Sequence, residues 1–262
     1  MAFLAVLCVL CVSAVNSPVR NLKLTIEYDG TNYAGWQTQT GRATVQQTIE
    51  EKILKITGER VHVQGSGRTD SGVHALGQVA NLKTHSKIPA AKLRLALNAL
   101  LPADIVVRRV SEAGPEFNAQ FNAKWKTYRY TILNDRVPTA LNRFFCHQVP
   151  VPLDVGAMRR AARCLVGRRD FQAFRSEGWR EKDTVRTIRR LTVSKKGRYI
   201  TVTVTGDGFL YNMVRAIVGT LIDIGRGKRP PEDMGGILAS RDRRQAGPTA
   251  PARGLCLVWV KY

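Results

Sequence analysis

The sequence has few of the residues from which metal and redox sites are built. Five cysteines leave an odd number, and the pair Cys8 and Cys11 lies in a purely apolar run, without the βαβ context of a thioredoxin-like site. Free thiols suit a reducing compartment. The four histidines are scattered, and no Cys or His pair has the spacing of a zinc site: His62, His74, His85 and His147. We therefore expect no metal and no small-molecule cofactor.

Nucleotide-binding signatures are missing as well. Glycines are concentrated at residues 65–72, but the Gly-Lys-Ser/Thr end of a phosphate-binding P-loop is absent. No predicted helix follows these glycines, so they do not form a dinucleotide-binding fingerprint either. The segment needs another explanation.

Acidic residues are scarce. The 262-residue chain has 20 Asp and Glu against 41 Lys and Arg, a formal net charge of +21. Such a balance indicates a polyanionic partner, nucleic acid or an anionic membrane, or else a proteome with a basic bias. Residues 157–198 carry a net charge of +10, with 14 basic and 4 acidic side chains. Aromatic residues that can stack on unpaired bases lie among them: Phe171, Phe174, Trp179 and Tyr199. We favour nucleic acid.

A long apolar run occurs at the N-terminus, from Ala2 to Val15. It is too short to span a bilayer with confidence, and it has the length of a signal-peptide core. No Lys or Arg precedes it, as a secretory signal would require. We predict that residues 1–20 are an extension outside the fold of a cytoplasmic protein without membrane contact. Targeting stays open as the alternative.

Periodicity predicts an α+β protein. Strand, helix, strand, strand, helix, strand is expected in that order over 21–28, 44–57, 61–64, 78–84, 89–100 and 104–110. This is the ferredoxin-like order. The second half repeats the theme, with strands at 124–133, 187–194, 199–205 and 254–261 and helices at 155–165, 211–224 and 231–239. We predict two ferredoxin-like domains, 21–113 and 114–262, with mainly antiparallel sheets, helices on one face and an RNA-binding cleft on the other.

The segment Gly65–His74 surrounds Arg68-Thr69-Asp70-Ser71 with glycines. Glycine permits positive φ and close approach of another chain, so a large ligand could reach a charged group here. A strand-to-strand loop in which Asp70 satisfies local amides is an equal alternative on these residues alone.

This segment resembles the signature loop of the TruA family of tRNA pseudouridine synthases. Other segments resemble the same family in the same order: Tyr28–Thr31, Tyr33–Gln37, Thr44–Gln46, Lys126–Tyr130, Lys182–Ile188, Gly208–Arg215 and Ala246–Pro251. The resemblance extends from Asn21 to Tyr262. It implies an isomerase that converts uridine to pseudouridine at tRNA positions 38–40 in the anticodon arm, and a homodimer.

The resemblance also implies roles for single residues. Asp70 is expected to be the nucleophile, with Arg215 as its cationic partner and Tyr128 stacked on the target uracil. Arg68 is expected to fill the space that a flipped base leaves, or else to contact a phosphate. Phe209 and Leu210 are expected to wall the uracil pocket, with ordinary core packing as the alternative. Arg215 could instead extend to solvent.

Two rival functions remain open. A non-catalytic RNA-binding protein of ferredoxin-like fold would explain the charge and the aromatic residues but not the Asp70 loop. A pseudouridine synthase that acts on another RNA site would explain both. One departure from the family pattern is Gln120, which stands where an Arg is usual.

Overall fold

A computed structural model describes residues 18–176 and 183–262. The apolar run with Cys8 and Cys11, as well as Trp179 and Lys182, lies outside the described residues. Within them, no helix is long and apolar enough to cross a membrane. The same residues contain no group of three or more His, Cys, Asp or Glu side chains that could hold a metal ion.

The N-terminal half follows the predicted element order. It consists of β1 (Arg20–Tyr28), α1 (Val45–Thr57), β2 (Gln64–Gly65), β3 (His74–Thr84), α2 (Ala90–Leu100) and β4 (Ile105–Ala113). Thr44 caps α1 by accepting a hydrogen bond from the Gln47 amide at 3.4 Å, and Gly58 ends the helix with φ 75°. The predicted range 44–57 therefore agrees with α1 to within one residue at each end.

Two strands of this half differ from expectation. In place of the strand predicted at 61–64, the structure has the two-residue strand β2. The Val63 amide donates a hydrogen bond to the Glu50 carboxylate of α1 at 2.8 Å, so it does not pair with a neighbouring strand. β3 begins at His74 rather than residue 78, because His74 pairs with Cys256 near the C-terminus. Both differences arise from contacts between residues far apart in sequence.

The C-terminal half contains longer connections. Its elements are β5 (Trp125–Leu133), β6 (His147–Gln148), α3 (Val155–Arg163), β7 (Gly167–Asp170), β8 (Val185–Lys196), β9 (Tyr199–Gly206), α4 (Met213–Gly225), α5 (Asp233–Ser240) and β10 (Leu255–Lys261). The sequence analysis missed β6 and β7, which are short and lack an apolar alternation. Short 3₁₀ turns lie at 172–174, 243–245 and 252–254.

One ten-stranded sheet joins the two halves. The strand order is β4-β1-β3-β10-β5-β9-β8-β7, with β2 and β6 beside this path. The last strand, β10, lies in the middle, parallel to β3 and antiparallel to β5. The predicted α+β class with mainly antiparallel pairing is confirmed. The division into domains 21–113 and 114–262 stays a prediction, since the sheet continues across it.

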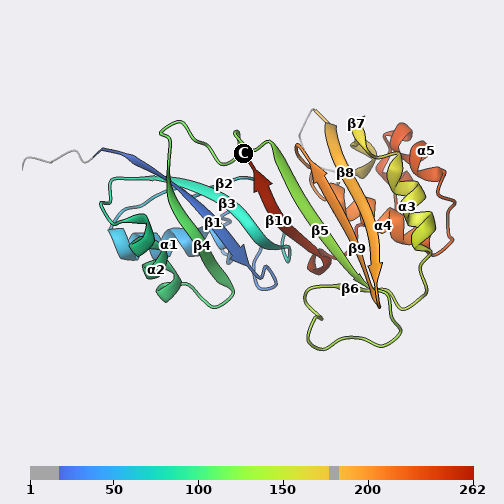
Figure 1. The fold of residues 1–262 in the computed structure, drawn as a ribbon, viewed down its shortest axis with the longest axis horizontal. Helices are drawn as coiled ribbons and strands as arrows, with labels where there is room; N and C mark the ends of the chain where they lie inside the picture. Colours follow the sequence, from blue (N-terminus) through green and yellow to red (C-terminus); the bar gives the residue numbers. More distant parts are fainter. Residues whose placement is uncertain (1–17, 177–182) are drawn as a thin grey trace, which may run out of the picture.

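The helices cover the two outer parts of one sheet face. Figure 1 shows α1 and α2 at one end of the molecule and α3, α4 and α5 at the other, with β10 between the two groups. Side chains on paired strands share a face, so the pairings Tyr28–Ala75, Ala75–Leu257 and Leu257–Tyr128 carry the core face across the sheet. All four residues belong to one buried cluster with α1 and α4. The middle of this face is the part that helices leave open.

Candidate active site

A cavity lies on this helix-bearing face, between the two groups of helices. Its volume is about 1050 Å³, and its lining includes Gln46 at the start of α1, Asp70, Tyr128 on β5 and Met213 at the start of α4. We expected the cleft on the opposite, helix-free face. That expectation was wrong in this respect, because two helix groups separated by the width of β10 leave a hollow on their own side of the sheet.

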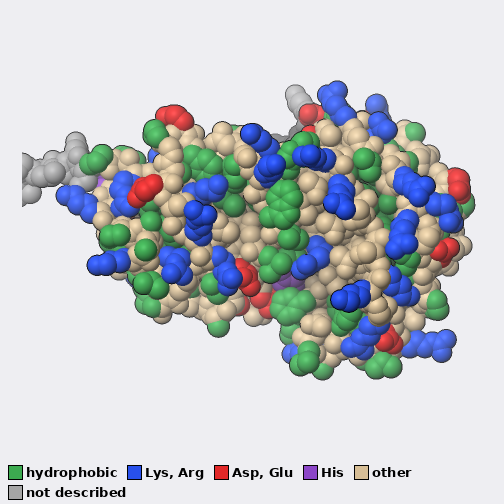
Figure 2. Space-filling view, in the orientation of Figure 1, with side chains coloured by type: hydrophobic (Ala, Val, Ile, Leu, Met, Phe, Trp, Pro, Cys, Tyr) green, Lys and Arg blue, Asp and Glu red, His purple; other side chains and the backbone are tan. Residues whose placement is uncertain are grey.

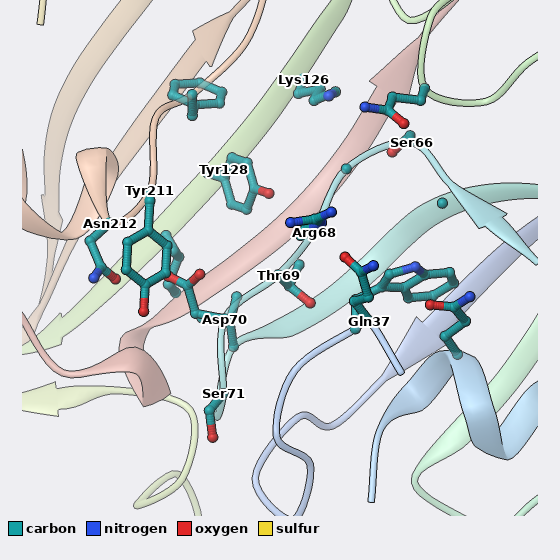
Figure 3. A pocket seen from close by; sticks show the side chains of 18 of the residues that line it. Gln37, Ser66, Arg68, Thr69, Asp70, Ser71, Lys126, Tyr128, Tyr211 and Asn212 are labelled. Atoms are coloured by element: carbon teal, nitrogen blue, oxygen red, sulfur yellow. The ribbon is translucent and has the colours of Figure 1, made fainter. Parts of the chain in front are cut away.

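The loop before β3 is shaped by tight packing against the segment after β1. Gly35 has φ +99°, and a Cβ there would lie 2.5 Å from the Thr69 carbonyl oxygen. A Cβ on Gly65 would lie 2.6 Å from the Trp36 indole ring. Buried Tyr28 bonds the Thr69 hydroxyl at 2.8 Å. The two segments that resemble the family signature are thus one packed unit that holds Asp70 at the cavity (Figure 3).

Asp70 is a partly buried carboxylate with a cationic partner. Its Oδ2 lies 3.5 Å from Arg215 Nη1, and the two side chains are 22% and 17% exposed. Burial raises the pKa of Asp70 above its ordinary value, while the charge and hydrogen bond of Arg215 lower it by less. The expected partner is present, but it offsets only part of the cost of burial. The Asp70 carboxylate is therefore more basic, and a better nucleophile, than an exposed one.

Arg215 is fixed from three sides. Besides its ion pair with Asp70, its Nε donates to the Ala250 carbonyl at 2.7 Å and its Nη1 donates to Asn212 Oδ1 at 2.7 Å. Asn212 has φ 60° at the N-terminal end of α4, a left-handed conformation that Asn tolerates. This geometry excludes the alternative in which Arg215 extends to solvent.

Tyr128 forms part of the cavity wall and is 8% exposed. The Phe209 ring meets it edge-on, with ring centroids 5.3 Å apart and planes at 90°. Phe209 and Leu210 also line the cavity. Burial raises the pKa of the Tyr128 phenol, so the hydroxyl keeps its proton. Together these side chains form an apolar part of the cavity wall.

Tyr130 shares the face of Tyr128 but does not line the cavity. It is fully buried, and its hydroxyl donates to the Pro251 carbonyl at 2.8 Å. A Cβ on Gly254 would lie 2.5 Å from the Tyr130 ring. Of the two tyrosines on β5, one is therefore available to a ligand and the other belongs to the core.

Three further residues named in the sequence analysis lie in different places. Arg68 is exposed at the cavity, beside Asp70 (Figure 3). His74 points away from this cavity and is buried, with Nδ1 3.0 Å from Asp29 Oδ1 and Nε2 2.8 Å from the Phe144 carbonyl. Gln120 lines the cavity and accepts a hydrogen bond from Gln64 at 2.8 Å.

Lys126 and Arg186 were given no role by the sequence analysis, yet both line the cavity. Each lies within a segment that resembles the family. The strand alternation that placed Tyr128 and Tyr130 on one face also places Lys126 there, and this signal could have found it.

The family comparison covers both sides of this cavity. A family model described as tRNA pseudouridine synthase matches residues 24–122 and 161–262. The chain belongs to the tRNA pseudouridine synthase family. It is 50% identical over 244 residues to tRNA pseudouridine synthase A of Acetivibrio thermocellus, a match that covers 93% of this chain and 100% of the relative. The same coverage holds for tRNA pseudouridine synthase A 2 of Clostridium perfringens at 49% identity and tRNA pseudouridine synthase A of a Thermoanaerobacter species at 46%.

Membership of the tRNA pseudouridine synthase family confirms the resemblance drawn from the sequence. The two matched ranges bring Arg68 and Asp70 from one half and Phe209, Leu210 and Arg215 from the other. These residues line a single cavity. The roles of single residues stay proposals.

Proposed function

We propose that this chain isomerises uridine to pseudouridine in tRNA, with Asp70 as the nucleophile. The observation that carries the assignment is the juxtaposition of the Asp70–Arg215 pair with the apolar wall formed by Tyr128, Phe209 and Leu210. A pyrimidine on that wall lies beside a carboxylate suited to covalent catalysis. No bound reactant other than the nucleotide itself is needed for the atoms to balance.

The reaction breaks the bond between N1 of uracil and C1′ of ribose, turns the detached ring and joins C5 to C1′. The proton on C5 is lost and one is gained at N1, so there is no net oxidation. Attack by Asp70 on the sugar or on the ring would form a covalent intermediate. Arg215 stabilises the carboxylate while it is free. Tyr128 holds the ring during its turn, and its protonated phenol can donate a hydrogen bond to it.

The substrate must leave its base stack to reach Asp70. A flipped base costs a few kcal/mol, least where stacking is weak, as in a loop. Arg68, which is exposed next to Asp70, would occupy the vacated space. We propose uridines at tRNA positions 38–40 in the anticodon stem-loop as the targets, on the strength of the family resemblance and the net charge of +21.

One assay tests the assignment. tRNA with tritium at C5 of uridine releases tritium only when C5 is rebonded to the sugar. We expect release by the wild type and none above background by Asp70→Asn, with tRNA binding retained in the variant. Absence of release by the wild type would refute the enzyme assignment. Equal release by both proteins would refute Asp70 as nucleophile.

The two rival functions give different results in the same experiment. A non-catalytic RNA-binding protein binds tRNA without release. A synthase with another target releases tritium from tRNA whose uridines at positions 38–40 are replaced by cytidine. The proposed target site requires that this replacement abolish release.

We also propose that the enzyme is a homodimer in the cytoplasm, where it meets tRNA. Exposed apolar side chains on the helix-free face support an interface: Leu76, Phe144, Phe145 and Trp259. Figure 2 shows a green column of hydrophobic side chains down the middle of the molecule, flanked by blue Lys and Arg. Sedimentation of the wild type and of Phe145→Asp tests this. Monomeric wild-type protein at micromolar concentration would contradict it.

A further inference from the structure

Asn212 stands at the N-terminal end of α4 in a backbone conformation that glycine adopts more readily. Its φ is 60° and its ψ is 5°, in the left-handed region, and Arg241 is the other described residue besides glycine with positive φ. Asn tolerates this region better than most residues, but only glycine enters it without strain. The choice of Asn indicates that its side chain contributes something that glycine would not supply.

That contribution is not the capping of α4. An Asn at the N-cap usually accepts a hydrogen bond from the backbone amide two or three residues later. Within the described residues, the Asn212 side chain makes no such bond. Instead, its Oδ1 accepts from Nη1 of Arg215 at 2.7 Å, and its Nδ2 donates to Ser176 Oγ at 2.8 Å. Both polar atoms of the amide are therefore used on neighbouring side chains.

The bond to Asn212 fixes the direction of the Arg215 guanidinium group. This group is planar, so its N–H bonds point in fixed directions within one plane. The Arg215 Nε donates to the Ala250 carbonyl at 2.7 Å, and one N–H of Nη1 donates to Asn212. These two bonds determine the plane. The same Nη1 lies 3.5 Å from Asp70 Oδ2, so its second N–H is the one left to face the carboxylate.

Asn212 is itself anchored to the segment that ends at Ser176. Besides the bond between the two side chains, the Ser176 amide donates to the Tyr211 carbonyl at 3.2 Å, one residue before Asn212. Tyr211, Asn212 and Asp70 all line the cavity (Figure 3). A chain of polar contacts thus extends from Ser176 through Asn212 and Arg215 to the nucleophile.

We propose that Asn212 is a positioning residue for the reaction, which holds Nη1 of Arg215 and thereby sets the contact between Arg215 and the Asp70 carboxylate. It acts through Arg215 and need not touch the uridine. The inference rests on the proposed function and adds one residue to that site.

The pH dependence of the reaction reports on this contact. The charged and titratable side chains that share the cavity with Asp70 include Arg68, Lys126, Tyr128, Arg186, Tyr211 and Arg215. Arg215 is the one whose charge and hydrogen bond lower the pKa of Asp70. A displaced Arg215 would therefore offset less of the effect of burial, and the pKa of Asp70 would rise.

Asn212→Gly tests the side chain with the backbone preserved, since glycine adopts a φ of 60° readily. The kcat for tritium release should fall about tenfold, with KM for tRNA within about twofold of wild type. The acidic limb of the pH–rate profile should move to higher pH. The Tm should stay close to that of the wild type.

Asn212→Asp is the second variant, because Asp has the same shape, tolerates the left-handed region and can still accept from Arg215. Its added negative charge should move the acidic limb to higher pH. Above that limb its kcat should approach the wild-type value, whereas Asn212→Gly should stay slow at every pH.

Arg241→Gly is the matched control for the backbone, because Arg241 has a φ of 55° and does not line the cavity. Its kcat and acidic limb should equal those of the wild type. A wild-type kcat and pH profile in Asn212→Gly would overturn the inference and leave the proposed function intact. Equal loss of activity at every pH in both Asn212 variants, with a matching fall in Tm, would overturn it as well, because the role would then be structural. Absence of release by the wild type would refute the proposed function and the inference with it.

Discussion

In the loop Gly65–His74, Asp70 in the middle and His74 at the end each contact an ionisable side chain, and the two contacts differ in kind. At the cavity, Asp70 meets Arg215 at 3.5 Å, and both side chains are partly exposed. Four residues later, His74 meets Asp29 at 3.0 Å with its side chain only 5% exposed. The first contact joins the two halves of the molecule across the cavity, and the second ties the loop to the segment after β1.

The difference lies in how completely each group is satisfied. His74 accepts from the Gly30 amide at 3.1 Å and donates to the Phe144 carbonyl, so both ring nitrogens have partners. The pKa of Asp70 is raised despite Arg215, so its carboxylate remains under-compensated. Hydrogen bonds fix the His74 end of the loop, whereas the middle of the loop holds a carboxylate that is stabilised when it reacts or takes up a proton.

Asp70→Asn should have the largest effect on activity. Tritium release should fall at least about 10⁴-fold, since the nucleophile is removed while the shape is kept. A raised pKa means that the native state binds more protons than the unfolded state, so the ionised carboxylate costs stability once pH exceeds its ordinary value. Thermal unfolding at neutral pH should therefore show an equal or higher Tm for the variant. A lower Tm would contradict the conclusion that the ionised Asp70 carboxylate costs stability in the folded protein.

Arg215→Met should lower kcat by about 100-fold. Loss of the cation should raise the pKa of Asp70 further, because burial is then unopposed. If the ionised carboxylate reacts, activity rises with pH through this pKa, and the acidic limb of the pH–rate profile should move to higher pH in the variant. Arg215→Lys should move it less. An unchanged acidic limb would show that Arg215 does not influence the titration of Asp70.

His74→Ala should act on stability more than on chemistry. It leaves the Gly30 amide and the Phe144 carbonyl without partners and opens a cavity, at a cost of about 2–3 kcal/mol. Urea unfolding measures this cost, and exposed His85→Ala is the control. The acidic limb of the pH–rate profile of the folded variant should match that of the wild type. A shifted acidic limb would mean that the hydrogen bonds of His74 also affect the titration of Asp70.

Tyr28→Phe should have the smallest effect. It removes the hydrogen bond between the Tyr28 and Thr69 hydroxyls in the middle of the loop and costs about 1 kcal/mol in urea unfolding. Activity should change less than threefold. A larger fall in kcat would show that the hydrogen bond to Thr69 also holds the neighbouring Asp70 in its reactive position.

Local signals in the sequence located most elements. The predicted helix over 44–57 and the predicted strand over 124–133 agree with α1 and β5 to within one residue at each end. The predicted strand bounds were wrong where a residue far along the chain determines the pairing of the strand. Examples are Glu50 capturing the Val63 amide and Cys256 extending β3 back to His74.

The candidate site shows the same limit. Asp70, Arg215 and Tyr128 were predicted from the family resemblance, and the structure brings them together. The side of the sheet that carries the cavity was not predictable, because it depends on how far apart the two helix groups are set. Nor could sequence show that burial outweighs Arg215 at Asp70, since desolvation is a property of the assembled fold.

The place of β10 has a consequence for how the sheet folds. β10 is the strand that joins β3 to β5, and Tyr128 and the Asp70 loop flank it. The two sides of the cavity can therefore meet only when β10 has taken its place between them. Without β10, the molecule would have two incomplete sheets with exposed edges, open to aggregation. Closure of the sheet and assembly of the site are thus one folding event.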